Sequence, residues 1–188
     1  MTRLYLYANA ANAWVLVLVL LAGFASQFLD NAPPCPLCMM QRMAMLLAAL
    51  GPCYVLFRAS KGQLAARDIA AGAGLLMLAS LLGAAISTRQ ILLHILPGDP
   101  GFGAPVLGYH MYTWALIVFA CNLLGAGLQL IGLAWFQPDA TKAPALARWT
   151  GLAVAVMLVA NILSVTAEAG FAWKLPDNPT GYLLFHPS

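Results

Sequence analysis

The sequence predicts an all-α protein, a multi-pass membrane helical bundle. Apolar residues make up 62% of the 188 residues and charged residues only 8%, whereas a soluble domain carries about 25% charged residues. The apolar residues gather into five runs, each close to the roughly 20 residues that a helix needs to cross a bilayer. A single integral membrane domain is therefore expected, and no basic stripe indicates nucleic-acid binding.

The five runs give the expected spanning helices. They lie at about residues 10–29, 39–57, 69–88, 111–136 and 150–170. Gly, Ala and Ser interrupt these runs, and such small residues let helix backbones approach each other in a membrane. The first run follows Arg3 and also resembles a signal peptide. A retained helix is favoured, because the rest of the chain is equally apolar and needs a first anchor.

The basic residues predict the orientation of the bundle. Those on one side precede the first run or lie between runs two and three or four and five: Arg3, Arg58, Lys61, Arg67, Lys142 and Arg148. Loops rich in Lys and Arg face the cytoplasm. We therefore expect a cytoplasmic N-terminus. The segment before the second run, the Gly- and Pro-rich loop 91–110 and the tail 171–188 are expected on the outer side.

Cys35 and Cys38 are the candidate functional residues, because they form a Cys-Pro-Leu-Cys motif directly before the second run. Pro36 suits the first helical position, where its missing N–H is not needed. Cys35 is then expected near the N-cap and Cys38 in the first turn. Free backbone N–H groups and the helix dipole stabilise a thiolate there, and thiolate is the reactive form in disulfide exchange. Arg42 adds positive charge one turn further on.

Other roles for this pair are less well supported by the pattern. A purely structural disulfide would close a very short loop and remove little entropy from the unfolded chain. A zinc site would need two more ligands, for which only His94 and His110 are near. Haem attachment requires a His directly after the pair, where this chain has Met39. We therefore expect redox chemistry and no metal, with the structural disulfide and zinc as alternatives.

The stretch Cys-Pro-Leu-Cys-Met-Met-Gln-Arg between two spanning helices resembles the bacterial disulfide-bond formation protein B (DsbB) family. The resemblance extends over about residues 10–136, with weaker matches at Arg89-Gln90 and Leu96-Pro97. It implies a four-helix core, to which this chain adds a fifth helix, in the bacterial inner membrane with the cysteine pair facing the periplasm. It also implies an enzyme that takes electrons from a periplasmic thioredoxin-fold (DsbA-like) dithiol oxidase and passes them to ubiquinone or menaquinone.

The resemblance also implies roles for individual residues. Cys38 would be the thiolate next to the quinone, and Cys35 would be its disulfide partner. Arg42 would match the quinone-binding arginine of the family. Gln90 falls where many members carry a quinone-proximal His. Arg89 and His94 are further candidates for contact with the quinone, although Arg89 is also typical of an interfacial residue.

The second outer loop departs from the family pattern. Family members carry a further cysteine pair there, but no cysteine lies between Gln90 and His110. Cys53 and Cys121 do not replace it, because they would lie about 22 Å and 15 Å below the outer helix ends. Both are expected to be buried and unpaired. A non-catalytic DsbB-like subunit or assembly factor, within a larger membrane complex, is therefore the alternative function.

Two acidic residues lie near the expected outer helix ends. Glu168 and Asp30 are predicted to be interfacial or paired. A proton-relay role is the alternative, because ionisable residues at membrane depth are often functional.

Overall fold

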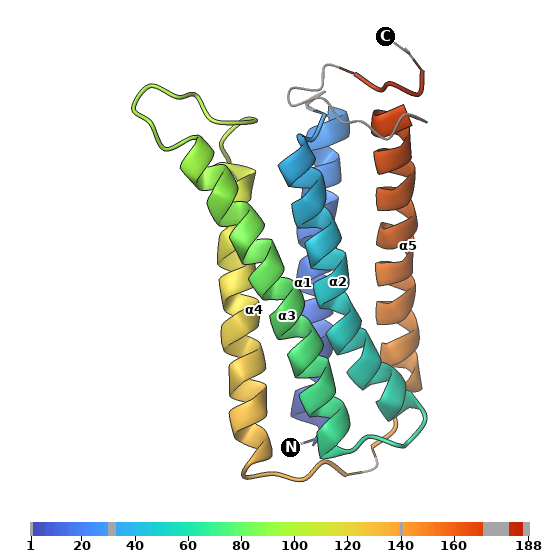
Figure 1. Ribbon diagram of the computed structural model, residues 1–188. Coiled ribbons are helices and arrows are strands. Elements are labelled where there is room, and N and C mark those ends of the chain that lie inside the picture. The colour runs from blue at the N-terminus through green and yellow to red at the C-terminus, as the bar shows by residue number, and fades with distance from the viewer. Residues whose placement is uncertain (1, 30–32, 140, 171–180, 186–188) are drawn as a thin grey trace.

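The described residues of the computed structural model form five helices, which run alternately up and down (Figure 1). The structure describes residues 2–29, 33–139, 141–170 and 181–185. The helices are α1 (Thr2–Leu29), α2 (Pro36–Ser60), α3 (Ala66–Leu93), α4 (Met111–Leu133) and α5 (Pro144–Ala169). All five are long and apolar enough to cross a membrane. The predicted all-α membrane bundle is confirmed.

Most of the helices are longer than the apolar runs that predict them. The helix α1 begins at Thr2, α3 continues to Leu93 and α5 begins at Pro144. A helix satisfies its own backbone hydrogen bonds and therefore does not have to stop where the apolar side chains stop. Leu78, Leu128 and other large apolar side chains are exposed on the outer surface of the bundle, as expected of a surface that faces lipid.

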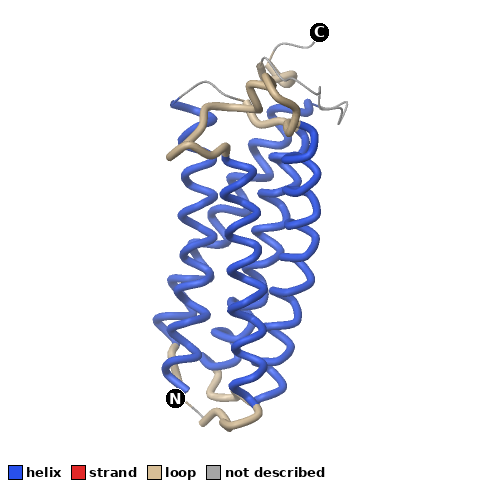
Figure 2. The backbone as a smooth tube through the Cα atoms, turned by 90° about the vertical axis from the view of Figure 1, so that its left-hand side faces the viewer, coloured by secondary structure: helices blue, strands red, loops and turns tan. Residues whose placement is uncertain are grey.

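The helix α2 has the most central position in the bundle. It packs against α1, α3 and α5, whereas α4 packs mainly against α3. The N-terminus and the α2–α3 and α4–α5 connections lie at one end of the bundle (Figures 1 and 2). The start of α2, the α3–α4 loop and the segment 181–185 lie at the other end. We call this second end the cysteine end.

The helices α2 and α3 approach each other closely at Gly51 and Gly72. A Cβ atom on Gly51 would overlap the carbonyl oxygen of Gly72, and one on Gly72 would overlap Val55. Small residues permit such backbone-to-backbone packing in membrane bundles. The contact fixes how α2 and α3 lie against each other, and thus helps to set where the start of α2 meets the end of α3.

Replacing Gly51 by alanine is expected to destabilise the protein by about 1–3 kcal/mol, because the added Cβ meets backbone that cannot rotate away. Thermal unfolding in detergent micelles measures the effect. Gly74→Ala on α3 is the matched control, since a Cβ there meets nothing within 4 Å and alanine favours the helix. Equal unfolding temperatures for the two variants would contradict the expectation.

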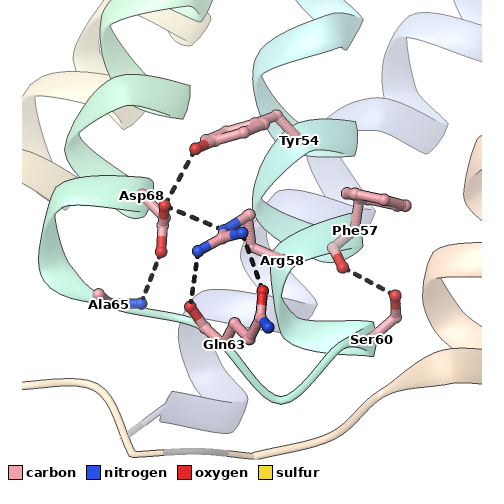
Figure 3. A network of polar contacts seen from close by, with 7 residues as sticks. All are labelled: Tyr54, Phe57, Arg58, Ser60, Gln63, Ala65 and Asp68. Carbon is pink, nitrogen blue, oxygen red and sulfur yellow. Dashed lines mark hydrogen bonds and ion pairs between the residues drawn. The ribbon is translucent and has the colours of Figure 1, made fainter.

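A polar network joins α2 to α3 at the opposite end of the bundle (Figure 3). The Asp68 carboxylate accepts hydrogen bonds from Arg58 Nε at 3.1 Å, from the Tyr54 hydroxyl at 3.0 Å and from the Ala65 N–H at 2.9 Å. Arg58 also donates to Gln63 Oε1 at 3.0 Å. The network closes the α2–α3 turn, so this helix pair is held both at its turn and at the glycine contact.

Candidate redox site

The two cysteines lie at the start of α2, where the sequence places them. Cys35 is the N-cap residue with extended backbone, and Pro36 follows at the start of the helix. The Cys38 N–H donates to Cys35 Sγ at 3.3 Å, so a sulfur takes the place of the usual capping oxygen. The two Sγ atoms are 2.7 Å apart and both cysteines are free. The helix start therefore holds the two sulfur atoms side by side.

The two thiols differ in their electrostatic environment. The hydrogen bond to the Cys38 sulfur raises the pKa of Cys35, and burial raises it further. Either sulfur can donate in the contact between them, and the raised pKa of Cys35 makes the Cys35 thiol the donor. This arrangement favours negative charge on Cys38, within the first turn of the helix, where the N–H groups and the dipole also stabilise it.

Gln90, near the end of α3, contacts both sulfur atoms. Its Nε2 lies 3.3 Å from Cys35 Sγ and 3.4 Å from Cys38 Sγ. The Gln41 side chain donates to Gln90 Oε1 at 2.8 Å and so holds the amide in place. Gln41 itself is not among the residues predicted from the sequence. Its signal is a polar side chain one turn into an apolar helix, beside the cysteine motif.

Arg42 is held against α1, one turn below the cysteines. Its Nη1 donates to Gln27 Oε1 at 2.7 Å and its Nη2 donates to the Gly23 carbonyl oxygen at 2.8 Å. The guanidinium lies 4.8 Å from the centre of the Phe24 ring. Arg42 is only 8% exposed and interacts electrostatically with Cys38. A buried, fixed positive charge therefore lies beside the reactive sulfur.

A cavity of about 80 Å³ opens at this point, between α1, α2, α4 and residues 102–104 of the α3–α4 loop. Cys38, Gln41, Arg42 and Tyr112 line it together with apolar side chains from all three helices. A flat, mostly apolar molecule in this cavity would have both the Cys38 sulfur and the Arg42 guanidinium within its binding site. Such a molecule would be placed to accept electrons from the Cys38 sulfur, and the Arg42 guanidinium would stabilise the negative charge that the molecule gains.

Four of the predicted residues are not part of the cavity lining: Cys35 and Gln90, which contact the Cys38 sulfur, and Arg89 and His94. Arg89 is exposed on α3. His94 Nδ1 is 3.0 Å from Asp99 Oδ1, and its ring stacks on Tyr112. The hydrogen bond from the Gly101 N–H, followed by that with His94, lowers the pKa of Asp99. No described contact links Arg89 to the site, whereas His94 is linked to the cavity through its stacking contact with Tyr112.

The remaining cysteines lie away from this site. Cys53 is half-buried and packs against the core. The expectation of a buried Cys121 is wrong, because its side chain is exposed on α4. The helix α4 packs mainly on α3, so much of its surface has no protein neighbour. Among the described residues, no three His, Cys, Asp or Glu side chains gather as a metal site requires.

Gln27 and Glu168 add further polar groups behind Arg42. Gln27 on α1 is 2% exposed and Glu168 in the last turn of α5 is 1% exposed. Gln27 is not among the residues predicted from the sequence. The available signal is a lone amide near the outer end of an apolar run. Asp30, which like Glu168 is expected from the sequence to be interfacial or paired, lies outside the described residues.

Known proteins resemble this chain over most of its length. The family profile described as "Disulfide bond formation protein DsbB" matches residues 6–104. Disulfide bond formation protein B of Hahella chejuensis is 32% identical over 158 residues, covering 81% of this chain and 85% of that protein. The protein of the same name from Chromohalobacter salexigens is 33% identical over 158 residues, covering 77% and 82%. No solved structure matches. The matched region contains the cysteine pair, Arg42 and Gln90, and the chain belongs to the DsbB family of membrane disulfide-bond formation proteins.

Proposed function

We propose that this protein is a thiol–disulfide oxidoreductase that passes electrons from a periplasmic dithiol partner through Cys35 and Cys38 to a membrane quinone. One observation carries the proposal: Cys38 and the buried Arg42 line the same cavity. The orientation expected from the basic residues places the cysteine end in the periplasm. Membership of the family supports ubiquinone or menaquinone as the acceptor and a DsbA-like protein as the donor.

The residues around the cavity suit a quinone headgroup. Their surface is mostly apolar, while Cys38 and Arg42 supply a sulfur and a cation. When bound, a quinone supplies the two-electron acceptor. The Arg42 guanidinium would stabilise negative charge on an acceptor oxygen in a site that excludes water. As Cys38 gives up electrons, Cys35 loses its proton and its sulfur forms the disulfide with Cys38.

A protein partner must exchange disulfides with this pair directly, because the loop from Ile91 to His110 contains no cysteine. Cys35 is 6% exposed. Exchange with a protein partner therefore requires a local opening at the cysteine end. The absence of a cysteine pair from this loop is also consistent with the alternative function, a DsbB-like subunit or assembly factor without catalysis.

Quinone reduction by the purified protein tests the proposal. The protein in detergent is mixed with a reduced thioredoxin-fold oxidase and with a soluble analogue of ubiquinone or of menaquinone, and quinol formation is followed by absorbance. We expect one quinol for each dithiol oxidised. When the oxidase is supplied in its disulfide form instead, we expect the Cys35 thiol of a Cys38→Ala variant to attack that disulfide, form a mixed disulfide and release one oxidase thiol. No quinol with either analogue, together with stable co-purification in a complex that tolerates Cys35→Ala, would favour the subunit function.

A further inference from the structure

Glu168 is a buried carboxyl group for which the proposed electron transfer has no role so far. It lies in the last turn of α5 and is 1% exposed. Neither carboxylate oxygen has a hydrogen-bond partner among the described residues. An isolated carboxylate in such a place is strongly disfavoured, and it ionises only if a compensating positive charge is near.

Arg42 is that positive charge. Glu168 interacts electrostatically with Arg42 and with Cys38. The connection between α2 and α5 runs through Gln27, which accepts a hydrogen bond from Arg42 at 2.7 Å and donates one to Ser164 Oγ at 3.0 Å. Ser164 lies four residues before Glu168, on the same face of α5. A continuous polar path therefore links the redox site to the fifth helix.

The titratable groups that face Glu168 come from two parts of the described chain. The helix α2 provides Arg42, Cys38 and, next to it, Cys35. The segment 181–185 provides Tyr182, whose hydroxyl accepts a hydrogen bond from Gln27 Nε2 at 3.1 Å. The helix α1 contributes only the neutral Gln27 here. The same segment lies over the end of α5, where the Leu183 N–H donates to the Glu168 carbonyl oxygen.

The charge at this buried site changes with the redox state of the cysteines. In the reduced pair, the Cys38 thiolate neutralises Arg42, and a second anion on Glu168 would be repelled by the first. In the oxidised pair, the sulfurs carry no charge, and Arg42 lacks a counter-ion unless Glu168 ionises. Ionisation of Cys38 and ionisation of Glu168 are therefore alternatives that compete for one cation.

We propose that Glu168 gains a proton when the Cys35–Cys38 pair is reduced and releases it when the pair is oxidised. The reduced site holds the Cys35 thiol, the Cys38 thiolate and the Glu168 carboxylic acid. Oxidation forms the Cys35–Cys38 bond, breaks the S–H bond of Cys35 and the O–H bond of Glu168, and releases two electrons and two protons. This is the amount that a quinone takes up to become a quinol. The inference rests on the proposed function for that last step.

The number of protons can be measured without a quinone or a protein partner. The protein, freed of quinone, is equilibrated with reduced and oxidised glutathione between about pH 5.5 and 7.5, where ordinary thiols stay protonated. Mass spectrometry of the alkylated peptide that contains Cys35 and Cys38 gives the reduced fraction. Glutathione releases two protons with its two electrons. If the protein takes up two protons, the exchange constant is independent of pH. If it takes up one, the constant for protein reduction rises about tenfold per pH unit.

We expect a pH-independent constant for the wild type and for Glu168→Asp, which keeps the acid. Glu168→Gln is expected to show the tenfold rise per pH unit. Asp139→Asn, which removes a carboxylate outside this cluster, should behave as the wild type. A tenfold rise in the wild type, or no change in Glu168→Gln, would overturn the inference. The wild-type measurement alone supports or overturns the inference, even if Glu168→Gln does not fold. Failure of quinone reduction would instead contradict the proposed function and leave this measurement unaffected.

Discussion

Replacing Cys38 by serine is expected to lower the rate of quinone reduction by at least about a thousandfold. Cys38 is the sulfur that lines the cavity beside Arg42, and Cys35 shares its proton with it. A serine hydroxyl does not ionise near neutral pH and cannot form a disulfide. Electrons from Cys35 therefore have no route to the quinone. The rate of quinol formation, with reduced oxidase in excess, measures the loss.

Two comparisons make this result specific. Cys121→Ser removes a thiol that is exposed on α4 and does not line the cavity, and it is expected to retain the wild-type rate. Cys38→Ser should still form a mixed disulfide through its Cys35 thiol when the oxidase is supplied in its disulfide form, which gel shift after alkylation detects. Substantial quinone reduction by Cys38→Ser would show that the reacting sulfur lies elsewhere.

Replacing Arg42 by methionine is expected to lower kcat for quinone reduction by about 10²–10³-fold, the loss typical when a group that stabilises developing negative charge is removed. Methionine is similar in length and apolar, so it fills the space that the guanidinium stem occupies. Gln27 Oε1 would lose the Arg42 donor but keep the Ser164 hydroxyl, and the Gly23 carbonyl oxygen would lose the Arg42 donor. Thermal unfolding should therefore also report a loss of stability relative to the wild type. Steady-state kinetics with a soluble quinone analogue separates kcat from KM.

Arg42→Lys and Arg67→Met complete the series. Lysine keeps the charge but cannot donate to Gln27 and Gly23 in the same fixed geometry, so an intermediate rate is expected. Arg67 lies near the start of α3, at the other end of the bundle, and its replacement removes one positive charge without touching the cavity. A wild-type rate in Arg42→Met would contradict the proposed role of the guanidinium.

The sequence predicts the local part of the site well, because the relevant residues are close along the chain. The proline after Cys35 and the four-residue spacing from Cys38 to Arg42 require only helix geometry. The structure confirms Cys35 as the N-cap and places Arg42 one turn below the pair. The number of helices and the fold class can be predicted equally well, since they follow from the lengths and apolar composition of the runs.

Contacts between helices cannot be predicted from the sequence in the same way. The helix α1 is apolar on most of its surface, so no amphipathic stripe indicates which side faces α2 and α5. The bond between Gln27 and Ser164, 137 residues apart, depends on that rotation. The prediction for Cys121 is wrong for the same reason, because the depth of a residue in the membrane does not distinguish a lipid-facing side chain from one in the core.

Because the described helices are five in number, the chain after the last helix lies at the opposite end of the bundle from the start of α1. This determines where a tag can be attached. Residues 181–185 lie at the cysteine end, with Tyr182 bonded to Gln27 and Leu183 over the last turn of α5. An affinity tag or reporter fused directly after Phe185 would therefore be attached at the cysteine end and would obstruct a visiting protein. A fusion before Thr2 would extend from the opposite end of the bundle. For kinetic work the N-terminus is the better point of attachment.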